Sequence, residues 1–246
     1  VLIDCGLFQG AENSGKGANA RDLATEFSIE HIRALIVTHV HIDHVGRIPY
    51  LLAAGFTGPI YCSQPSARLL PVVLEDALKV GVTRNKRLIE RVTRRLQQMI
   101  RPVDYGVWQR IEVLGKSPLA VQFRRAGHIL GSAWVDFRCG AGEDQRHVIF
   151  SGDLGATETP LLLPPDQPES CDMLVLESTY GDRNHEGRAR RQAALEGIIR
   201  HALKDAGTVL IPAFSIGRTQ ELLYELEDIL YRNRGKAAAD DLRWDD

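Results

Sequence analysis

A short apolar run leads directly into a cluster of metal-binding side chains, and this junction constrains the fold more than any other feature. Ala34-Leu35-Ile36-Val37 is brief, β-branched and apolar, which is typical of a buried strand. The segment Thr38-His39-Val40-His41-Ile42-Asp43-His44 follows at once. Packing gains nothing from removing four titratable groups together from water, so we interpret the cluster as a metal site.

The spacing within the cluster divides it between two cations. In an extended segment, side chains two residues apart point the same way, so His39 and His41 can reach one ion. Asp43 and His44 lie past the turn and can reach a second ion. Nitrogen and oxygen ligands of this kind suit Zn²⁺ and also Mn²⁺ or Fe²⁺.

Two later segments are candidates to complete the site. His128 lies between two expected strands, in Gly127-His128-Ile129-Leu130-Gly131-Ser132, and Asp153 follows an apolar strand, in Ser151-Gly152-Asp153-Leu154-Gly155. Taken alone, His128 is more often a polar loop residue and Asp153 a turn-forming or helix-capping residue. Both become candidate ligands because a metal needs more ligands than His39 and His41 supply.

The remaining chain alternates apolar runs with helical patterns, which predicts an α/β fold with both faces of a sheet covered. A basic helix is expected over residues 84–101, ending before Pro102, and we favour a solvated face over an RNA-contacting one for it. The expected strands are 1–4, 34–37, 59–62, 119–125, 133–138, 147–150, 173–176 and 208–211, and the other expected helices are 48–52, 66–80, 187–206 and 217–231.

Composition sets only wide bounds. The 246 residues carry a formal net charge of −2, so nucleic-acid binding would need a local basic surface. The four cysteines form no C-x-x-C pair, which fits a reducing cytoplasm. No apolar run approaches the roughly 20 residues of a membrane span. The chain starts at Val1 within an expected strand, which suggests a fragment.

The order His39, His41, Asp43, His44, then His128, then Asp153 resembles the metal motifs of the metallo-β-lactamase superfamily. That resemblance implies an αββα sandwich. It also implies that His39, His41 and His128 hold a first Zn²⁺, that Asp43 and His44 hold a second, and that Asp153 bridges both. Asp4 resembles the superfamily's first motif, whose aspartate orients the histidine loop.

The segment Glu177-Ser178-Thr179-Tyr180-Gly181-Asp182 is similar to a motif of the β-CASP group, specifically its RNA-processing members. The resemblance implies a metallo-β-lactamase domain over residues 1–180, with its first strands missing, and the beginning of an inserted α/β β-CASP domain over 181–246. Ile211-Pro212-Ala213-Phe214-Ser215-Ile216-Gly217-Arg218 also looks like that insert. Ser215, Gly217 and Arg218 are candidate substrate contacts there, because helix N-termini and arginine bind phosphate. A capped turn with a surface arginine explains them equally well.

The resemblance implies a two-zinc hydrolase of phosphodiester bonds that cleaves single-stranded RNA, as an endo- or exoribonuclease, through a metal-activated hydroxide. Asp43, Asp153 and Glu177 are the catalytic candidates, with Glu177 supporting a histidine that would lie beyond this chain. We expect no membrane association and leave a homodimer open. The alternatives are a hydrolase of a small ester or thioester, and a non-catalytic scaffold subunit of an RNA-processing complex.

Overall fold

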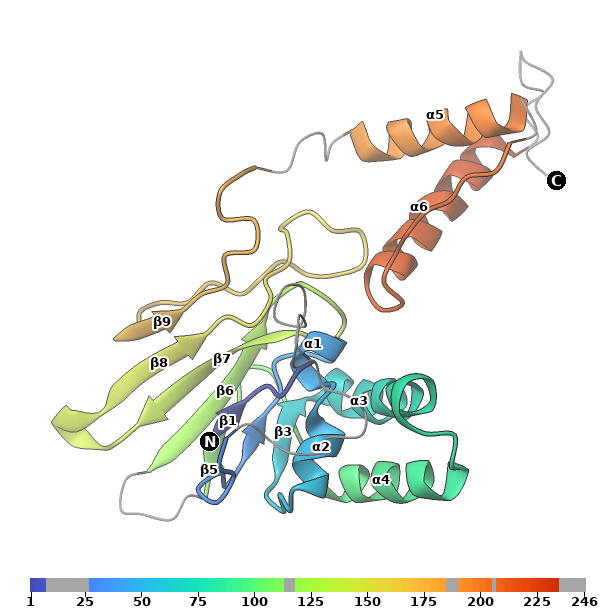
Figure 1. The fold of residues 1–246 in the computed structure, drawn as a ribbon. Coiled ribbons are helices and arrows are strands. Elements are labelled where there is room, and N and C mark those ends of the chain that lie inside the picture. Colours follow the sequence, from blue (N-terminus) through green and yellow to red (C-terminus); the bar gives the residue numbers. More distant parts are fainter. Residues whose placement is uncertain (8–26, 113–117, 185–189, 205–206, 235–246) are drawn as a thin grey trace. The chain divides into compact units, whose positions relative to one another are not determined.

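The computed structural model describes residues 1–7, 27–112, 118–184, 190–204 and 207–234 (Figure 1). The chain divides into two compact units. The first consists of Val1–Glu158 and Leu162–Glu177, and the second of Thr159–Leu161 and Ser178–Asp246. The first unit holds both β-sheets, and the second holds two helices.

A parallel sheet of four strands forms one layer of the first unit. Its order is β1 (Leu2–Ile3), β2 (Leu35–Ile36), β3 (Ile60–Ser63) and β4 (Ile100–Val103). Parallel neighbours need crossover connections, which helices commonly supply. Between β2 and β3 the chain forms α1 (Ile42–Val45) and α2 (Ile48–Ala53), and between β3 and β4 it forms α3 (Gln64–Ala77), a π-helical turn (Leu78–Val82) and α4 (Lys86–Met99).

A second sheet of five strands forms the next layer. Its order is β5 (Trp108–Ile111), β6 (Leu119–Arg125), β7 (Ala133–Cys139), β8 (Arg146–Phe150) and β9 (Met173–Val175). The first four strands are antiparallel to their neighbours, whereas β9 runs parallel to β8. A short 3₁₀ helix (Gly142–Asp144) lies between β7 and β8.

The core lies between the two sheets. Ile36 of the parallel sheet packs in one cluster with Phe123 and Val135 of the antiparallel sheet. Leu35 is equally buried, and because adjacent strand residues face opposite ways, it lies on the other face of its sheet. That face packs against the helices, so β2 is buried on both sides, as its continuous apolar sequence predicts.

Side-chain caps mark the starts of α3 and α4. The Ser63 side chain accepts a hydrogen bond from Ser66 N at the start of α3, and Asn85 does the same for Leu88 N at the start of α4. Each cap satisfies a backbone donor that would otherwise lack a partner. The apolar positions of α4 that are buried recur at helical spacing, namely Ile89, Leu96 and Met99.

Most expected strands and helices of the first unit are confirmed, and the main differences concern β4, β5 and β7. The helix expected over 84–101 ends at Met99, and Pro102 lies in β4. Proline is tolerated there because β4 is an edge strand. β7 is buried along Ala133–Phe137 rather than half-buried, because a loop covers the outer face of this strand. Asp166 lies in that loop, and its carbonyl oxygen accepts a hydrogen bond from the Trp134 indole. β5 was not expected.

The second unit is a helix pair, α5 (Arg191–Lys204) and α6 (Arg218–Asn233). Arg191 Nε donates to Glu225 Oε1 at 2.6 Å, and Gln192 donates to Asp228 at 2.6 Å. The strand expected over 208–211 is wrong: these residues are irregular and exposed, because no neighbouring strand pairs with them among the described residues. The ends of the expected helix at 187–189 and 205–206 lie outside the described residues.

No helix within the described ranges has both the length and the apolar character needed to cross a bilayer.

Candidate metal centre

The candidate ligands lie where strands of both sheets end. Asp4 and Thr38 follow the parallel neighbours β1 and β2, and Asp153 and Glu177 follow the parallel neighbours β8 and β9. Strands that run in parallel release the chain at the same edge, so residues distant in sequence meet there. The loop between β6 and β7 adds His128 to the same edge.

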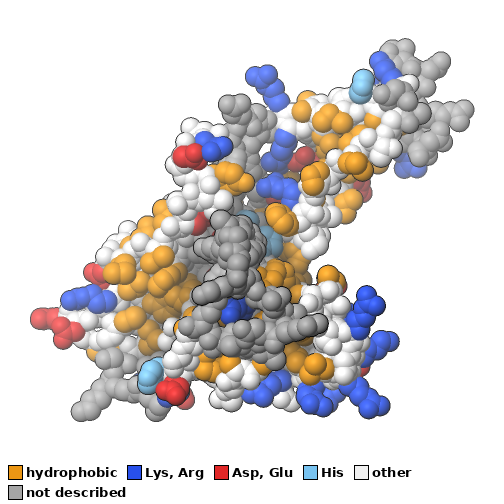
Figure 2. All heavy atoms as spheres, viewed as in Figure 1, with side chains coloured by type: hydrophobic (Ala, Val, Ile, Leu, Met, Phe, Trp, Pro, Cys, Tyr) orange, Lys and Arg blue, Asp and Glu red, His pale blue; other side chains and the backbone are white. Residues whose placement is uncertain are grey.

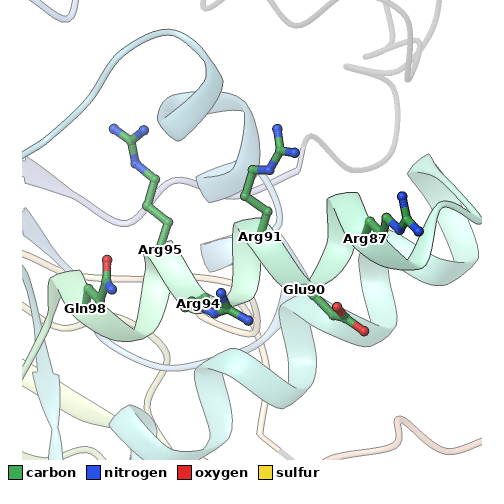
Figure 3. A pocket seen from close by; sticks show the side chains of 6 residues that line it. All are labelled: Arg87, Glu90, Arg91, Arg94, Arg95 and Gln98. Atoms are coloured by element: carbon green, nitrogen blue, oxygen red, sulfur yellow. The ribbon is translucent and has the colours of Figure 1, made fainter.

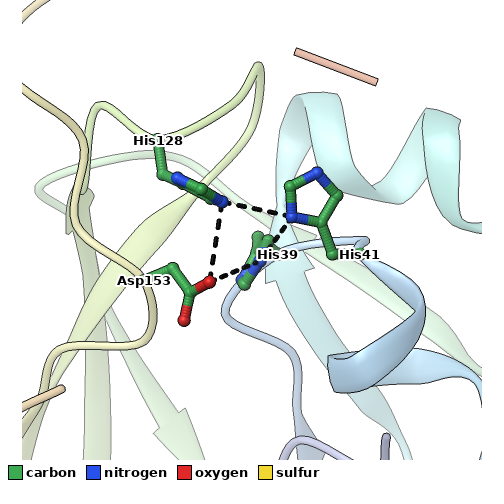
Figure 4. A group of neighbouring side chains, drawn as sticks. All are labelled: His39, His41, His128 and Asp153. Atoms are coloured by element: carbon green, nitrogen blue, oxygen red, sulfur yellow. Dashed lines mark hydrogen bonds and ion pairs between the residues drawn. The ribbon is translucent and has the colours of Figure 1, made fainter. Parts of the chain in front are cut away.

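Four side chains converge on one point (Figure 4). The potential ligand atoms of His39, His41, His128 and Asp153 all lie within 4.8 Å of one another. His41 Nδ1 lies 3.2 Å from His39 Nε2 and 3.1 Å from His128 Nε2. Ring nitrogens that face each other this closely need a proton or a cation between them. This group is therefore suited to hold one metal ion.

A second group shares one residue with the first. Asp43, His44 and Asp153 also place their ligand atoms within 4.8 Å of one another. His44 Nε2 lies 3.2 Å from Asp153 Oδ1, whereas His39 Nε2 and His128 Nε2 approach Asp153 Oδ2, at 3.8 and 3.6 Å. The two carboxylate oxygens of Asp153 therefore face different groups, which is the arrangement of a bridging ligand.

Asp4 connects the two groups from behind. Its Oδ1 accepts a hydrogen bond from Thr38 N, and its Oδ2 accepts one from Thr38 Oγ1 and lies 2.7 Å from His44 Nδ1. An ionised carboxylate only accepts, so His44 must carry a proton on Nδ1 and direct Nε2 toward Asp153. Asp4 itself has a positive φ of 55°, a strained conformation that functional sites often retain.

Thr38 fixes the proton position of His39 in the same way. Its hydroxyl proton goes to Asp4, so Thr38 Oγ1 accepts from His39 Nδ1, 3.1 Å away. This fixes the tautomer that leaves His39 Nε2 free for a cation. No role for Thr38 was predicted from the sequence, although its position between a buried strand and the cluster was a usable signal.

Glycines permit the close approach of the loops that carry these ligands. A Cβ on Gly6 would lie 1.4 Å from Asp43 O, and a Cβ on Gly155 would lie 1.7 Å from Gly127 O. Gly6 thus brings the β1 end against α1, and Gly155 brings the Asp153 loop against the His128 loop. Any side chain at either position would push apart the two segments that meet there.

Electrostatics within the cluster favours a cation. Burial and the neighbouring His44 hold the pKa of His39 well below its usual value, so the ring is neutral and able to coordinate. Burial and the neighbouring His41 likewise lower the pKa of His128. The hydrogen bond from His44 lowers the pKa of Asp153 to about 2, which keeps its carboxylate ionised.

His44 behaves differently from the other histidines. Burial lowers its pKa, but the hydrogen bonds with Asp153 and Asp4 outweigh burial and raise the pKa to about 10. Without a cation, the ring is therefore protonated at neutral pH. Coordination through Nε2 requires this proton to leave, so metal and proton compete for the same atom.

Glu177 lies against the Asp153 loop. Its Oε1 accepts a hydrogen bond from Leu154 N at 2.7 Å, and its own N–H donates to Ser151 Oγ at 2.9 Å. Glu177 thus holds residues on either side of Asp153, Leu154 through its side chain and Ser151 through its backbone. The sequence predicted a catalytic role for Glu177 but not this contact, which depends on the parallel pairing of β8 and β9.

The candidate substrate contacts lie in the second unit. Arg218 Nη1 donates to Glu221 Oε2 at 2.7 Å, and the Gln220 side chain accepts from Gly217 N. Ser215 is exposed. The arginine and the helix N-terminus are thus partly satisfied within α6, and phosphate binding there remains a prediction.

Known proteins resemble this chain in sequence. The family model of the metallo-beta-lactamase superfamily matches residues 1–182. "Ribonuclease TTHA0252" from Thermus thermophilus is 39% identical over 228 residues, which is 92% of this chain and 49% of that protein. "Transcription termination factor FttA" from Methanocaldococcus jannaschii is 35% identical over 235 residues, 93% of this chain and 35% of that protein. The chain thus spans half or less of these relatives.

Solved structures align with this chain only at low similarity. The Rm3 metallo-beta-lactamase aligns with 97% of this chain and 74% of its own, at 17% identity and a TM-score of 0.38. Unliganded yeast PDE1 aligns with 83% of this chain and 53% of its own, at 12% identity and a TM-score of 0.35.

Proposed function

The chain belongs to the metallo-β-lactamase superfamily, and we propose that it is the metal-binding part of a ribonuclease of the β-CASP group. One observation carries the proposal. Four imidazoles and two carboxylates from distant segments converge into two groups that share Asp153. The superfamily supports a divalent-metal hydrolase, and RNA as the substrate is the further step that we propose.

Two observations favour RNA. The relatives that match over nearly the whole chain are named as a ribonuclease and a transcription termination factor. The motif Glu177-Ser178-Thr179-Tyr180-Gly181 is similar to that of RNA-processing β-CASP enzymes. We further propose that residues 181–246 begin the inserted β-CASP domain, within which Ser215, Gly217 and Arg218 contact phosphate.

Each side chain of the centre has a role in metal binding. His39, His41 and His128 hold one cation, Asp43 and His44 hold the other, and Asp153 binds both. Zn²⁺ fits this donor set best, and Mn²⁺ or Fe²⁺ fits it as well. Cations bound there supply Lewis acidity, which acidifies water and neutralises charge on phosphate oxygens.

The other groups position these ligands. Asp4 holds His44, and Thr38 holds His39, each through the ring nitrogen that faces away from the cation. Glu177 holds the backbone next to Asp153, and its second oxygen, which has no hydrogen bond to any described residue, can orient a proton donor on another segment.

The test uses the full-length protein with its metal content measured by mass spectrometry. Cleavage of single-stranded RNA is compared with hydrolysis of single-stranded DNA, a chromogenic lactam and a thioester. We expect cleavage of RNA, and we expect Asp153→Ala to lose both metal and cleavage. Asp144→Ala removes an exposed carboxylate from the 3₁₀ helix of the same unit and serves as the matched control.

Two outcomes would contradict the proposal. If the metal-loaded protein hydrolyses the lactam or the thioester but leaves RNA intact, the substrate is wrong. If Asp153→Ala retains the full metal content, the bridging role of Asp153 is wrong. A protein that holds metal but hydrolyses nothing would instead indicate a scaffold subunit.

A further inference from the structure

The exposed face of α4 is basic far beyond the rest of the chain. Residues 84–101 contain seven lysines and arginines against one glutamate, while the whole chain has a net charge of −2. Basic side chains gather over α4 on the molecular surface (Figure 2). A groove of about 500 Å³ follows this face, lined by Arg87, Glu90, Arg91, Arg94, Arg95 and Gln98 (Figure 3). We call these six residues the α4 groove.

The charges of the α4 groove are not compensated within the described residues. Arg87, Arg91 and Arg94 form no ion pair with any described carboxylate, and Glu90 forms none either. Arg95 donates one hydrogen bond, to Phe56 O at 3.2 Å. Figure 3 shows Arg91 and Arg95 extending from the same side of the helix. The guanidinium groups of Arg87, Arg91 and Arg94 are therefore available to an anionic partner, and Arg95 retains donors beyond the one given to Phe56 O.

This arrangement of like charges destabilises α4. Arg87 and Arg91 are four residues apart, as are Arg91 and Arg95, and like charges at this spacing destabilise a helix. Lys86 and Arg87 also occupy the first turn, where the helix dipole favours acidic residues. A merely solvated face normally mixes both signs of charge. A helix that keeps this repulsion becomes more stable when a bound anion neutralises the charges.

We propose that the α4 groove binds the phosphate backbone of single-stranded RNA, away from the metal centre. This inference rests on the proposed function for the identity of its occupant. Successive arginines four residues apart are about 6 Å apart along the helix axis, close to the separation of neighbouring phosphates in an extended strand. Guanidinium groups bind phosphate through two parallel hydrogen bonds, and they also stack on bases.

The same observations disfavour the other anionic partners. Attachment to a lipid surface through a helix requires an exposed apolar face, but the apolar side of α4 is buried through Ile89, Leu96 and Met99. Protein interfaces centre on aromatic and apolar side chains, and the α4 groove has none among its lining residues. RNA presents a regular row of negative charges, and its binding requires neither an exposed apolar helix face nor a centre of aromatic and apolar side chains.

The test measures binding separately from cleavage. The triple variant Arg87→Gln, Arg91→Gln, Arg94→Gln retains helix-forming side chains and removes three charges. Its matched control removes three exposed charges elsewhere in the first unit, through Arg68→Gln, Arg110→Gln and Arg146→Gln. Both are made in full-length protein that also carries Asp153→Ala, and binding of a fluorescent 30-nucleotide RNA of mixed sequence is followed by anisotropy at increasing salt.

We expect the α4 variant, but not the control, to bind RNA more weakly and with a shallower salt dependence. Each phosphate contact on a single strand contributes about 0.7 to the slope of log K against log salt, so losing three reduces the slope by about 2. Over a fourfold rise in salt, that difference amounts to roughly a twentyfold change in relative affinity. The Tm of the α4 variant should not be lower than that of the control, because the substitutions relieve repulsion between like charges.

The outcomes separate this inference from the proposed function. Equal affinity and equal slope in the α4 variant and the control would overturn the RNA-binding role of α4, even if the intact protein cleaves RNA. Selective loss in the α4 variant would support it, even if no cleavage is found. Binding to anionic vesicles or to an acidic polypeptide that is stronger than to RNA, and is lost in the α4 variant, would overturn RNA as the occupant.

Discussion

Replacing Asp4 with asparagine tests how the second cation position is prepared. The carboxylate accepts hydrogen bonds from the backbone and hydroxyl of Thr38 and from His44 Nδ1. In Asp4→Asn, one oxygen becomes an NH₂ group that can only donate. Where that group faces His44, it favours the tautomer with the proton on Nε2, which is the atom that should meet the cation.

The size of the effect follows from the position of Asp4 behind the ligands. Mutation of a residue that orients a metal ligand costs about 10- to 100-fold in metal affinity, or about 1.4 to 2.8 kcal/mol. Asp4 acts on His44 directly and on His39 only through Thr38. The loss should therefore be largest for the cation held by Asp43 and His44, so the variant retains one tight ion and binds the second weakly.

Calorimetric titration of the chelator-treated protein with Zn²⁺ resolves the two binding steps. Thr38→Val is the matched control, because it removes the hydroxyl shared by Asp4 and His39 but leaves the contact between Asp4 and His44 in place. It should weaken the ion held by His39. If Asp4→Asn binds both ions with the affinity of the wild type, the tautomer argument is refuted.

Four further predictions concern the centre and its support. Phe123→Ala, at a fully buried position, should cost about 3–5 kcal/mol in urea unfolding, because it empties the space between the sheets. Gly155→Ala should lower metal affinity at constant helix content by circular dichroism, since its Cβ collides with Gly127 O. Glu177→Ala leaves Leu154 N without its acceptor and should lower the free energy of unfolding by about 1–3 kcal/mol. An unchanged free energy of unfolding would show that this hydrogen bond is dispensable. Zn²⁺ at a hundredfold excess over its Kd should add about 2.7 kcal/mol of stability per site, and removal of the metal with EDTA should reverse this gain and lower Tm in calorimetry.

Much of this protein is readable from local sequence. The period-two spacing of His39 and His41 was enough to place them together, and the structure brings both into one group. The strand ending at Val37 was evident because a continuous apolar run of that length fits a strand buried on both faces. The helix expected over 84–101 is confirmed but begins at Lys86, after Asn85, whose capping hydrogen bond to Leu88 N is local.

Other features depend on neighbours that are distant in sequence. Ile100–Val103 is a strand because β3 lies beside it, although the preceding helical pattern runs into Arg101. Residues 208–211 have the apolar sequence of a strand but remain irregular, because the pairing that defines a strand is not local.

The sequence by itself determined which side chains could bind cations and on which strand ends they stand, because residue type and spacing are local properties. Only the tertiary structure decided that Asp153 faces both groups and that Asp4 sets the proton of His44. It also decided that Glu177 holds the Asp153 loop. These contacts join segments dozens of residues apart, and their geometry is set by which strands lie side by side.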